Sequence, residues 1–450
     1  MGTPNFKLNA QMLSVEITKI INEDRINCFA KETGFTCREG GKLNGYKFLD
    51  MLLFTHFNFK KLSLNDLSVQ LAKRYGITIR KQSIDERFNE NAVKFLKSIM
   101  EEAIKISINP NNKIDFTKYG KVKIKDSTSF QLPENMKDVY QGSGGSSSDA
   151  CIRIQFEYDL KDKKILDLSF HPYTTQDMTN AKDTIHDIKQ NDLIIRDLGY
   201  IKVKYLEQIE TQKAFYLNRL HSSTNAYENE NGEIIKINFA ELYKQMKVNN
   251  QIRLDKKVYI GSKDKFETRI IIELLPEEMY KERLRKAEKN AKRNGRKISK
   301  ARKAKMGLNI FITNTDIPAK QIRLLYTLRW QIELMFKIWK SIGEIHEVKK
   351  MKVERFEACL FAKLIWIVIN WQIMRYIIIY FFNEHKIEIS PYKLFKTLKA
   401  DIIEFRNAII KGLNNITKFI EENVKICPEN HKSEKKKKSL TWSYEIMRMF

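Results

Sequence analysis

The sequence predicts a mixed α/β fold in which a core of strands and helices lies between two helical parts. From about residue 115, segments alternate apolar and polar residues as half-buried strands do, and short apolar strands then alternate with helical segments. Up to about residue 112, and again over 343–450, apolar residues recur at intervals of three and four, as in helices. Alternating strands and helices indicate an α/β core, and 450 residues correspond to about three structural units.

The chain is strongly basic. Its 81 Lys and Arg residues outnumber its 55 Asp and Glu residues, which gives a net charge of +26. Such an excess indicates a polyanionic partner, nucleic acid first and an anionic membrane surface second. A hydrophobic content of 42% with only 8 Pro and 17 Gly excludes a disordered or collagen-like chain.

Cysteine usage and the N-terminal residues favour a cytoplasmic protein. The five cysteines include no Cys-x-x-Cys pair, so they predict neither a disulfide framework nor a zinc site. The first residues lack the basic and then apolar order of a signal peptide.

In the helical part that comes first, residues 63–76 have a helical period and stop at Gly76. A second helix is expected from Ser83, because Ser83 and Glu86 have the spacing of a capping box. This outline fits a helix-turn-helix and equally an ordinary helical hairpin. It is the basic residues near the turn that make the two interpretations equally favoured: Arg74, Arg80, Lys81 and Arg87.

The core follows in a recognisable order. The expected elements are a strand at 121–126, a loop rich in Gly and Ser at 141–149, two strands joined by a tight turn at Lys161-Asp162, a helix at 177–190, a strand at 192–197, a helix at 202–210 and a strand at 213–220. The first three strands are expected to be antiparallel, and the later ones to alternate with helices.

Residues 221–305 interrupt this pattern with further strand-like segments that are polar at alternate positions. They lead into the densely basic segment 281–305, which is either a solvated charge run or, as we favour, an arm that contacts phosphates. A strand is expected again at 308–314 and a long helix from near Pro318. The lysine cluster 435–438 is expected to be a flexible tail.

One segment, 359–382, is long and apolar enough to be mistaken for a membrane span. It carries Lys363, Asn370, Gln372 and Arg375, and an ionised residue at the bilayer centre costs roughly 2.5–3.5 kcal/mol. We therefore expect a buried helix of a soluble protein, without a membrane partner.

The segment 326–340 is the most informative. In an α-helix, Tyr326, Arg329, Glu333 and Lys340 share a face about 60° wide, and apolar residues fill the opposite side. A surface helix with ion pairs at i,i+4 explains the charges alone. A carboxylate ringed by cations also suits a site that binds a phosphodiester beside a metal ion. Trp330 and Lys337 flank this face.

Two aspartates could complete such a metal site. Asp126 closes the strand 121–126 and Asp197 closes the strand 192–197, so both are expected at ends of neighbouring core strands. Facing Glu333, they would form a cluster of three carboxylates that binds two Mg²⁺ ions roughly 3.5–4 Å apart. Spacing alone is weak support among 55 acidic residues, and the placement at strand ends is what favours these two.

These motifs resemble the signature of bacterial insertion-sequence transposases of the DDE class, in the large family with a Y-R-E-K helix (insertion-sequence family four). The resemblance covers about 115–345. It rests on Tyr326-x2-Arg329-x3-Glu333-x6-Lys340, on the Asp-Ser-Thr turn at Asp126 and on Asp197-x-Gly199-Tyr200. It implies an RNase H-like core with Asp126, Asp197 and Glu333 as catalytic and metal-binding residues, and with two Mg²⁺ ions that Mn²⁺ can replace.

The resemblance also implies a domain organisation. We expect a helical DNA-end-binding domain at 1–114, the core at 115–220 and 306–345, a β-rich insertion with a basic arm at 221–305, and a helical C-terminal domain at 346–450 that serves dimerisation. Relatives cut through a hairpin intermediate, and some stack a flipped base on a tryptophan of the insertion. Residues 221–305 contain no Trp. Two alternatives follow: the hairpin step differs in this protein, or another aromatic residue of the insertion substitutes, namely Tyr227, Tyr243, Tyr259 or Phe266.

The function that follows is cut-and-paste DNA transposition. The enzyme would bind the terminal inverted repeats of its element, cleave the ends and join them to target DNA. Double-stranded DNA and a second copy of the chain in a synaptic homodimer are the expected partners, in the bacterial cytoplasm at the nucleoid. The residues expected to contact DNA are Tyr326, Arg329, Lys337 and Lys340. The alternatives are a Mg²⁺-dependent DNA endonuclease without strand transfer and a non-catalytic DNA-binding derivative.

Overall fold

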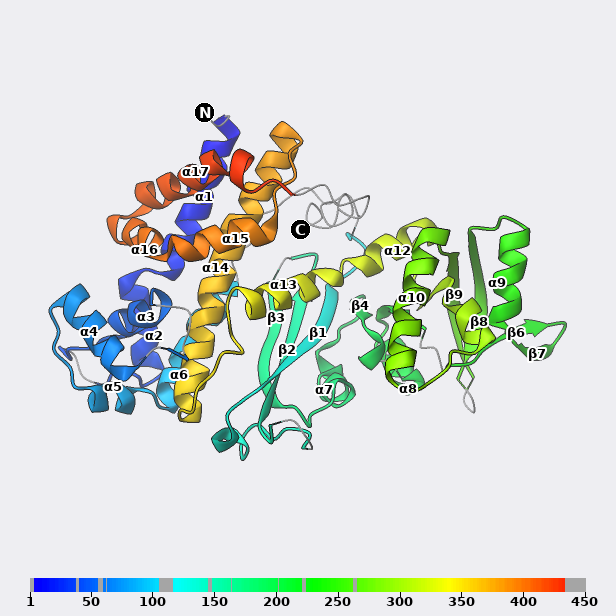
Figure 1. Ribbon diagram of the computed structural model, residues 1–450, viewed down its shortest axis with the longest axis horizontal. Coiled ribbons are helices and arrows are strands. Elements are labelled where there is room, and N and C mark those ends of the chain that lie inside the picture. The colour runs from blue at the N-terminus through cyan, green and yellow to red at the C-terminus, as the bar shows by residue number, and fades with distance from the viewer. Residues whose placement is uncertain are drawn as a thin grey trace.

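A helical body, a central sheet and a strand-rich extension follow one another along the molecule in the computed structural model (Figure 1). The structure describes residues 4–37, 40–55, 60–61, 63–104, 116–144, 148–162, 164–200, 202–220, 224–261 and 265–433. The mixed α/β class expected from the sequence is confirmed. The lysine cluster 435–438 lies outside the described residues, as does part of the loop 141–149.

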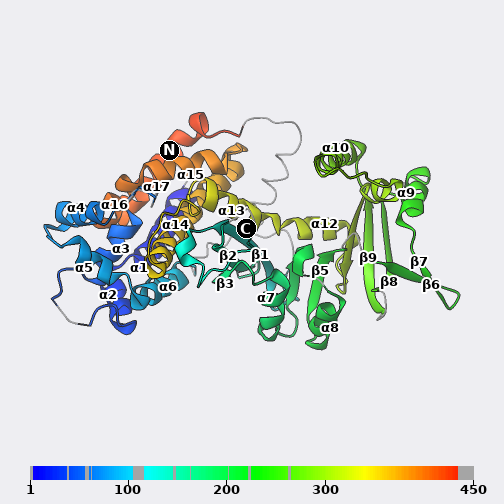
Figure 2. The same cartoon turned by 60° about the horizontal axis from the view of Figure 1, so that its bottom comes forward.

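The helical body combines both ends of the chain. Its helices are α1 (Pro4–Ile20), α2 (Glu23–Glu32), α3 (Gly45–Leu53), α4 (Leu64–Tyr75), α5 (Lys81–Arg87), α6 (Glu90–Ile104), α14 (Val353–His385), α15 (Pro391–Ala400), α16 (Ile402–Lys411) and α17 (Leu413–Asn430). Helix α1 packs against α17, and α6 packs against α14, so the first and last helices share one hydrophobic core (Figures 1 and 2).

The capping box predicted at Ser83 and Glu86 is wrong. Helix α5 begins at Lys81, so Ser83 lies inside it, and no side chain caps its first turn. A new helix, α6, starts at Glu90 after a break, where the side chain of Asn89 accepts a hydrogen bond from the Ala92 amide. The capping box lies instead at Ser63, whose side chain and the side chain of Asp66 each accept from the other's backbone N–H.

The long apolar helix α14 lies in the interior of this body. It is the one described helix that is long and apolar enough to cross a membrane, and 83% of its most apolar window is buried inside the fold. The polar residues within the apolar segment, Lys363, Asn370, Gln372 and Arg375, are all buried as well. The prediction of a buried helix is therefore confirmed.

The sheet has ten strands in the order β3-β2-β1-β4-β5-β10-β9-β8-β6-β7. The strands are β1 (Val122–Gln131), β2 (Cys151–Asp159), β3 (Lys164–Pro172), β4 (Leu193–Arg196), β5 (Phe215–Arg219), β6 (Ala226–Glu230), β7 (Glu233–Lys236), β8 (Arg253–Ile260), β9 (Phe266–Leu274) and β10 (Leu308–Thr313). Strands β1, β2 and β3 are antiparallel neighbours, whereas β4 runs parallel to both β1 and β5. Strand β10 then pairs antiparallel with β5 and with β9, so the insertion extends the core sheet.

Helices cover both faces of the sheet. The remaining elements are η1 (Glu134–Met136), α7 (Asp177–Asp183), η2 (Ile185–Asp187), η3 (Leu198–Tyr200), α8 (Val203–Thr211), α9 (Phe239–Val248), α10 (Glu277–Arg293), α11 (Lys300–Lys305), α12 (Ala319–Thr327) and α13 (Trp330–Ser341). Figure 2 shows α12 and α13 along one face and α7 and α8 on the other. Helix α9 was not expected from the sequence, and the basic segment 281–305 falls largely in α10 and α11.

Candidate active site

Strand pairing brings two of the predicted acids together. Strands β1 and β4 are parallel and in register from Val122 opposite Leu193 to Lys125 opposite Arg196. Asp126 and Asp197 are the next residue on each strand, so both lie just beyond the carboxyl end of this parallel pair. The expectation that Asp126 closes its strand is wrong, because β1 continues to Gln131 through its pairing with β2.

The segment 326–340 supplies the third acid. It forms two helices rather than one, because a tight turn at Leu328 and Arg329 separates α12 from α13. Both turn residues keep helical dihedral angles, and the Arg329 amide donates to the Tyr326 carbonyl at 3.2 Å. Tyr326, Arg329 and Glu333 therefore still lie on one side across the turn. Buried apolar residues anchor α13, among them Trp339, whose ring centroid lies 5.5 Å from that of Phe156 in β2.

The guanidinium of Arg329 lies at the centre of the site. Its Nη1 is 2.6 Å from Asp126 Oδ2, and its Nη2 is 2.7 Å from Glu333 Oε1 and 3.9 Å from Asp197 Oδ1. The Tyr326 hydroxyl donates to Asp197 Oδ1 at 3.2 Å. The structure thus gathers three acids from β1, from the end of β4 and from α13 around one cation.

Exposure differs sharply among these groups. The side chain of Arg329 is only 5% exposed and that of Asp126 is 18% exposed, whereas Asp197 and Glu333 are 42% and 43% exposed. Solvent and ligands can therefore reach the site from the side of Asp197 and Glu333, whereas Arg329 lies on its buried side.

Burial and neighbouring charge set the protonation of the site. Burial raises the pKa of Asp126 to about 6, with Asp197 and Glu333 adding to the rise and Arg329 opposing it. Burial would lower the pKa of Arg329, but the surrounding Tyr326 and carboxylates raise it above its ordinary value. Burial also raises the pKa of Tyr326, so its hydroxyl keeps its proton and stays a donor.

The other predicted residues of this helix lie apart from the acids. Lys340 is half-buried and donates from Nζ to the Ser129 carbonyl near the end of β1 at 2.9 Å. Lys337 is exposed, and Trp330 is 51% exposed. The structure thus joins Tyr326 and Arg329 to the acidic cluster, but neither Lys337 nor Lys340.

The donor atoms of the three acids are of the type that binds a divalent ion, although the acids are closed around Arg329 in this structure. Carboxylate oxygens are the hard ligands that Mg²⁺ prefers, and two of the three acids are open to solvent. In the described part of the chain, no three His, Cys, Asp or Glu side chains are grouped so that they could hold a metal ion. Arg329 is the cation that contacts Asp126, Asp197 and Glu333. A metal ion bound to these acids would therefore have to share the carboxylates with Arg329 or displace its guanidinium.

Of the basic residues near the predicted helix-turn-helix, Arg74 has a structural role. Its side chain is 8% exposed, and its guanidinium pairs with Asp50 at 3.1 Å and donates to the Asp50 carbonyl. Arg74 is therefore held by Asp50, whereas Arg80 and Lys81 are exposed.

Among the aromatic candidates of the insertion, Tyr243 belongs to its buried core. Tyr243 is buried with its ring 5.8 Å from that of Tyr280, and the ring of Phe266 lies 6.3 Å from that of Tyr216. Phe266, Tyr227 and Tyr259 are each only partly buried, and Tyr227 pairs with Tyr259 across β6 and β8.

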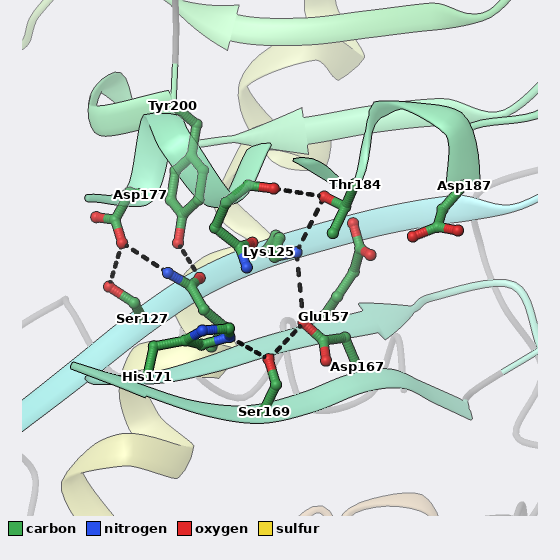
Figure 3. Close-up of polar contacts among 12 residues, drawn as sticks. Lys125, Ser127, Glu157, Asp167, Ser169, His171, Asp177, Thr184, Asp187 and Tyr200 are labelled. Atoms are coloured by element: carbon green, nitrogen blue, oxygen red, sulfur yellow. Dashed lines mark hydrogen bonds and ion pairs between the residues drawn. The ribbon is translucent and has the colours of Figure 1, made fainter. Parts of the chain in front are cut away.

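The sequence did not reveal a polar cluster that contacts β1 on the face opposite α13. Figure 3 shows Asp177 beside Ser127 and Tyr200, on the sheet face opposite α13. Asp177 is the first residue of α7, and nothing in its local sequence distinguishes it from other acids at helix starts. The Asp197-x-Gly199-Tyr200 motif was the one available signal, because it contains Tyr200.

Comparisons with a family model and with individual proteins all identify similarity to transposases. Residues 120–369 match the family model described as a transposase DDE domain. The chain is 31% identical to the transposase for insertion sequence element IS231C of Bacillus thuringiensis subsp. berliner, over 95% of this chain and 94% of that protein. It is 30% identical to the transposase for insertion sequence element IS1151 of Clostridium perfringens, over 94% of this chain and 93% of that protein.

Proposed function

Because this chain belongs to the DDE transposases of insertion-sequence family four, it is an enzyme of DNA transposition with an RNase H-like core, and we propose that Asp126, Asp197 and Glu333 are its catalytic carboxylates. One observation carries the proposal: acids from three separate elements surround a single buried guanidinium. A surface helix with local ion pairs would not bring Asp126 and Asp197 to Glu333.

Family membership implies dependence on a divalent metal ion. We propose that the ion is Mg²⁺, two per site, with Mn²⁺ able to substitute, and that Asp126, Asp197 and Glu333 hold it. Bound there, the ions would activate the attacking oxygen and stabilise the leaving oxygen of an in-line phosphoryl transfer.

The other residues of the site have roles in binding DNA. In this proposal Arg329 neutralises the acids until DNA binds, and its guanidinium then contacts a phosphate near the cleaved end. Lys337 and Lys340 contact phosphates farther along the duplex, and the hydroxyl of Tyr326 keeps Asp197 in place. Terminal repeats and target DNA are the substrates, and a homodimer brings two ends together in the cytoplasm at the nucleoid.

The test is cleavage and strand transfer on duplexes that carry the ends of the element. Asp126→Asn, Asp197→Asn and Glu333→Gln should each lower the Mg²⁺-dependent cleavage rate about a thousandfold or more, since each removes several kcal/mol of transition-state stabilisation. The exposed Asp187, on the opposite face of the sheet, is the matched control, and Asp187→Asn should cleave normally.

Cleavage near the wild-type rate in any of the three variants would remove that residue from the mechanism. Cleavage by the wild-type protein without any joining to target DNA would favour an endonuclease. Salt-sensitive binding without cleavage would favour a non-catalytic DNA-binding protein.

A further inference from the structure

Strand β1 presents its side chains alternately to the two faces of the sheet. Asp126 points to α13, where it meets Arg329, whereas the next residue, Ser127, points to α7. The Ser127 hydroxyl donates to Asp177 Oδ1 at 2.7 Å, so the carboxylate of Asp177 is attached to β1 directly beside Asp126.

The same carboxylate oxygen gathers two residues of β2. Arg153 Nη1 donates to Asp177 Oδ1 at 2.9 Å, and Gln155 Nε2 donates to it at 3.0 Å. One bond therefore comes from a guanidinium, and charge-assisted bonds of this kind are stronger than neutral ones. Asp177 is consequently fixed against two adjacent strands.

The network also reaches the segment that carries Asp197. The side-chain carbonyl of Gln155 accepts a hydrogen bond from the Tyr200 hydroxyl at 2.9 Å, and Tyr200 is only 1% exposed. The Tyr200 amide in turn donates to the Asp197 carbonyl at 3.1 Å. Asp177 Oδ2 would lie 3.5 Å from a Cβ built on Gly199, so Asp177 packs directly against this turn.

The position of this hydrogen-bond network indicates its role. Register between β1 and β4 ends at Lys125 opposite Arg196, one residue short of both aspartates. Beyond that pair, the network through Asp177 connects the two carboxylate-bearing segments from the opposite face of the sheet (Figure 3). On the basis of the proposed function, we propose that Asp177 is a positioning residue that holds Asp126 and Asp197 at the separation a divalent ion requires.

The consequence is specific because Mg²⁺ demands nearly ideal octahedral geometry. Loss of a residue that orients metal ligands typically lowers metal affinity or activity about 10–100-fold. A network that only stabilised the fold would instead lower the unfolding temperature and leave the metal affinity of the folded protein unchanged.

The experiment measures Mn²⁺ binding by electron paramagnetic resonance in the complex of the full-length protein with precleaved end DNA. The same complex of a double variant, Asp126→Asn with Glu333→Gln, gives the background binding to DNA. Asp177→Ala should weaken Mn²⁺ binding about 10–100-fold and raise the Mg²⁺ concentration for half-maximal cleavage similarly. Asp177→Asn keeps an acceptor oxygen and should restore most of the loss. Affinity for end DNA should stay within about twofold.

Asp192 provides the matched structural control. It forms an ion pair with the Lys123 ammonium at 2.8 Å on the same face of β1, and its side chain is 3% exposed. Asp192→Ala should lower the unfolding temperature at least as much as Asp177→Ala, with normal Mn²⁺ affinity. Where Asp177→Ala fails to fold, Tyr200→Phe removes a single hydroxyl from the network and should still weaken Mn²⁺ binding severalfold.

Wild-type Mn²⁺ affinity in Asp177→Ala or Tyr200→Phe would overturn the inference. A loss of Mn²⁺ affinity in Asp192→Ala equal to that in Asp177→Ala would also overturn it. The proposed function would remain if the double variant of the acids loses Mn²⁺ binding and cleavage. If that double variant binds Mn²⁺ and cleaves as the wild type does, the proposed function itself fails.

Discussion

At the scale of single residues, Arg329 determines the state of the site. Its fork-shaped guanidinium contacts Asp126 and Glu333 and approaches Asp197, and its side chain is 5% exposed. The sequence indicated that Arg329, Glu333 and Tyr326 share a face, because helical spacing depends on local sequence alone. It could not indicate that Arg329 would pair with Asp126, since that contact joins residues 203 positions apart.

Removal of this cation should leave three acids repelling one another. We expect Arg329→Ala to lower the free energy of unfolding by about 1–3 kcal/mol, because a buried charge cluster loses its partner. Millimolar Mn²⁺ should restore stability to the variant more than to the wild type, since the ion replaces the lost positive charge. Thermal unfolding with and without Mn²⁺ measures both effects. Lys337→Ala, on the exposed side of the same helix, should change stability by less than about 0.5 kcal/mol.

At the scale of secondary-structure elements, local patterns predicted which elements exist better than where they end. The alternation in 121–126 identified β1, but the strand continues through Asp126 because β2 pairs with it along its whole length. The spacing at Ser83 and Glu86 has the form of a capping box, yet tertiary packing starts α5 two residues earlier and ends it before Phe88, which is fully buried.

The two capping sites make a direct comparison. Ser63→Ala should lower the free energy of unfolding by about 0.5–2 kcal/mol, because Ser63 caps α4. Ser83→Ala should have an effect below about 0.5 kcal/mol, because Ser83 lies within α5 and caps nothing. Urea unfolding of both variants measures these changes. An equal loss of free energy of unfolding in the two variants would contradict the assignment of the cap to Ser63.

Lys363 in helix α14 should make the stability of the protein depend on pH. Burial lowers the pKa of Lys363 to about 7, and its Nζ donates to the Glu344 carbonyl at 2.7 Å. Between pH 7 and the ordinary lysine pKa of 10.5, the unfolded chain binds a proton at Lys363 that the folded protein does not. Because the unfolded state binds more protons, the contribution of Lys363 to stability must rise with pH over this window.

Comparison with Lys363→Met isolates this contribution from other titrating groups. The difference in free energy of unfolding, wild type minus variant, should rise by up to about 1.4 kcal/mol per pH unit between pH 7 and pH 9. Urea unfolding at several pH values measures the slope. A flat or falling difference would show that Lys363 stays charged in the folded protein.

At the scale of the whole molecule, one sheet joins the site to the insertion. The ten strands run without interruption from β3 to β7, and the site lies where the parallel strands β1 and β4 separate. The sequence predicted most of the succession of elements, although not helix α9, and it indicated a strand-rich insertion. It could not give the order of strands across the sheet, because β5 pairs with β10, nearly a hundred residues later. Nor could it reveal Asp177, whose role depends on contacts from β1 and β2 together.

The basic helix α10 lies on the same side of the sheet as α12 and α13 (Figure 2). It has no fully buried residue, and its exposed cations include Arg285, Lys289 and Lys292 at helical spacing. We expect replacement of these three by Gln to reduce the slope of log affinity against log salt concentration for DNA by about 2–3, because each phosphate contact contributes about 0.9. The same change at Lys411, Lys418 and Lys425, exposed in the helical body, should leave the slope nearly unchanged. Equal slopes for all three proteins would exclude α10 from the interface.

The most direct test of the proposed active site is anomalous X-ray diffraction from crystals of the protein with end DNA and Mn²⁺. We expect Mn²⁺ peaks bounded by the carboxylates of Asp126, Asp197 and Glu333, with the Arg329 guanidinium moved onto a phosphate. Peaks coordinated by other residues, or three acids still closed around Arg329 in a complex that cleaves DNA, would contradict the proposed site.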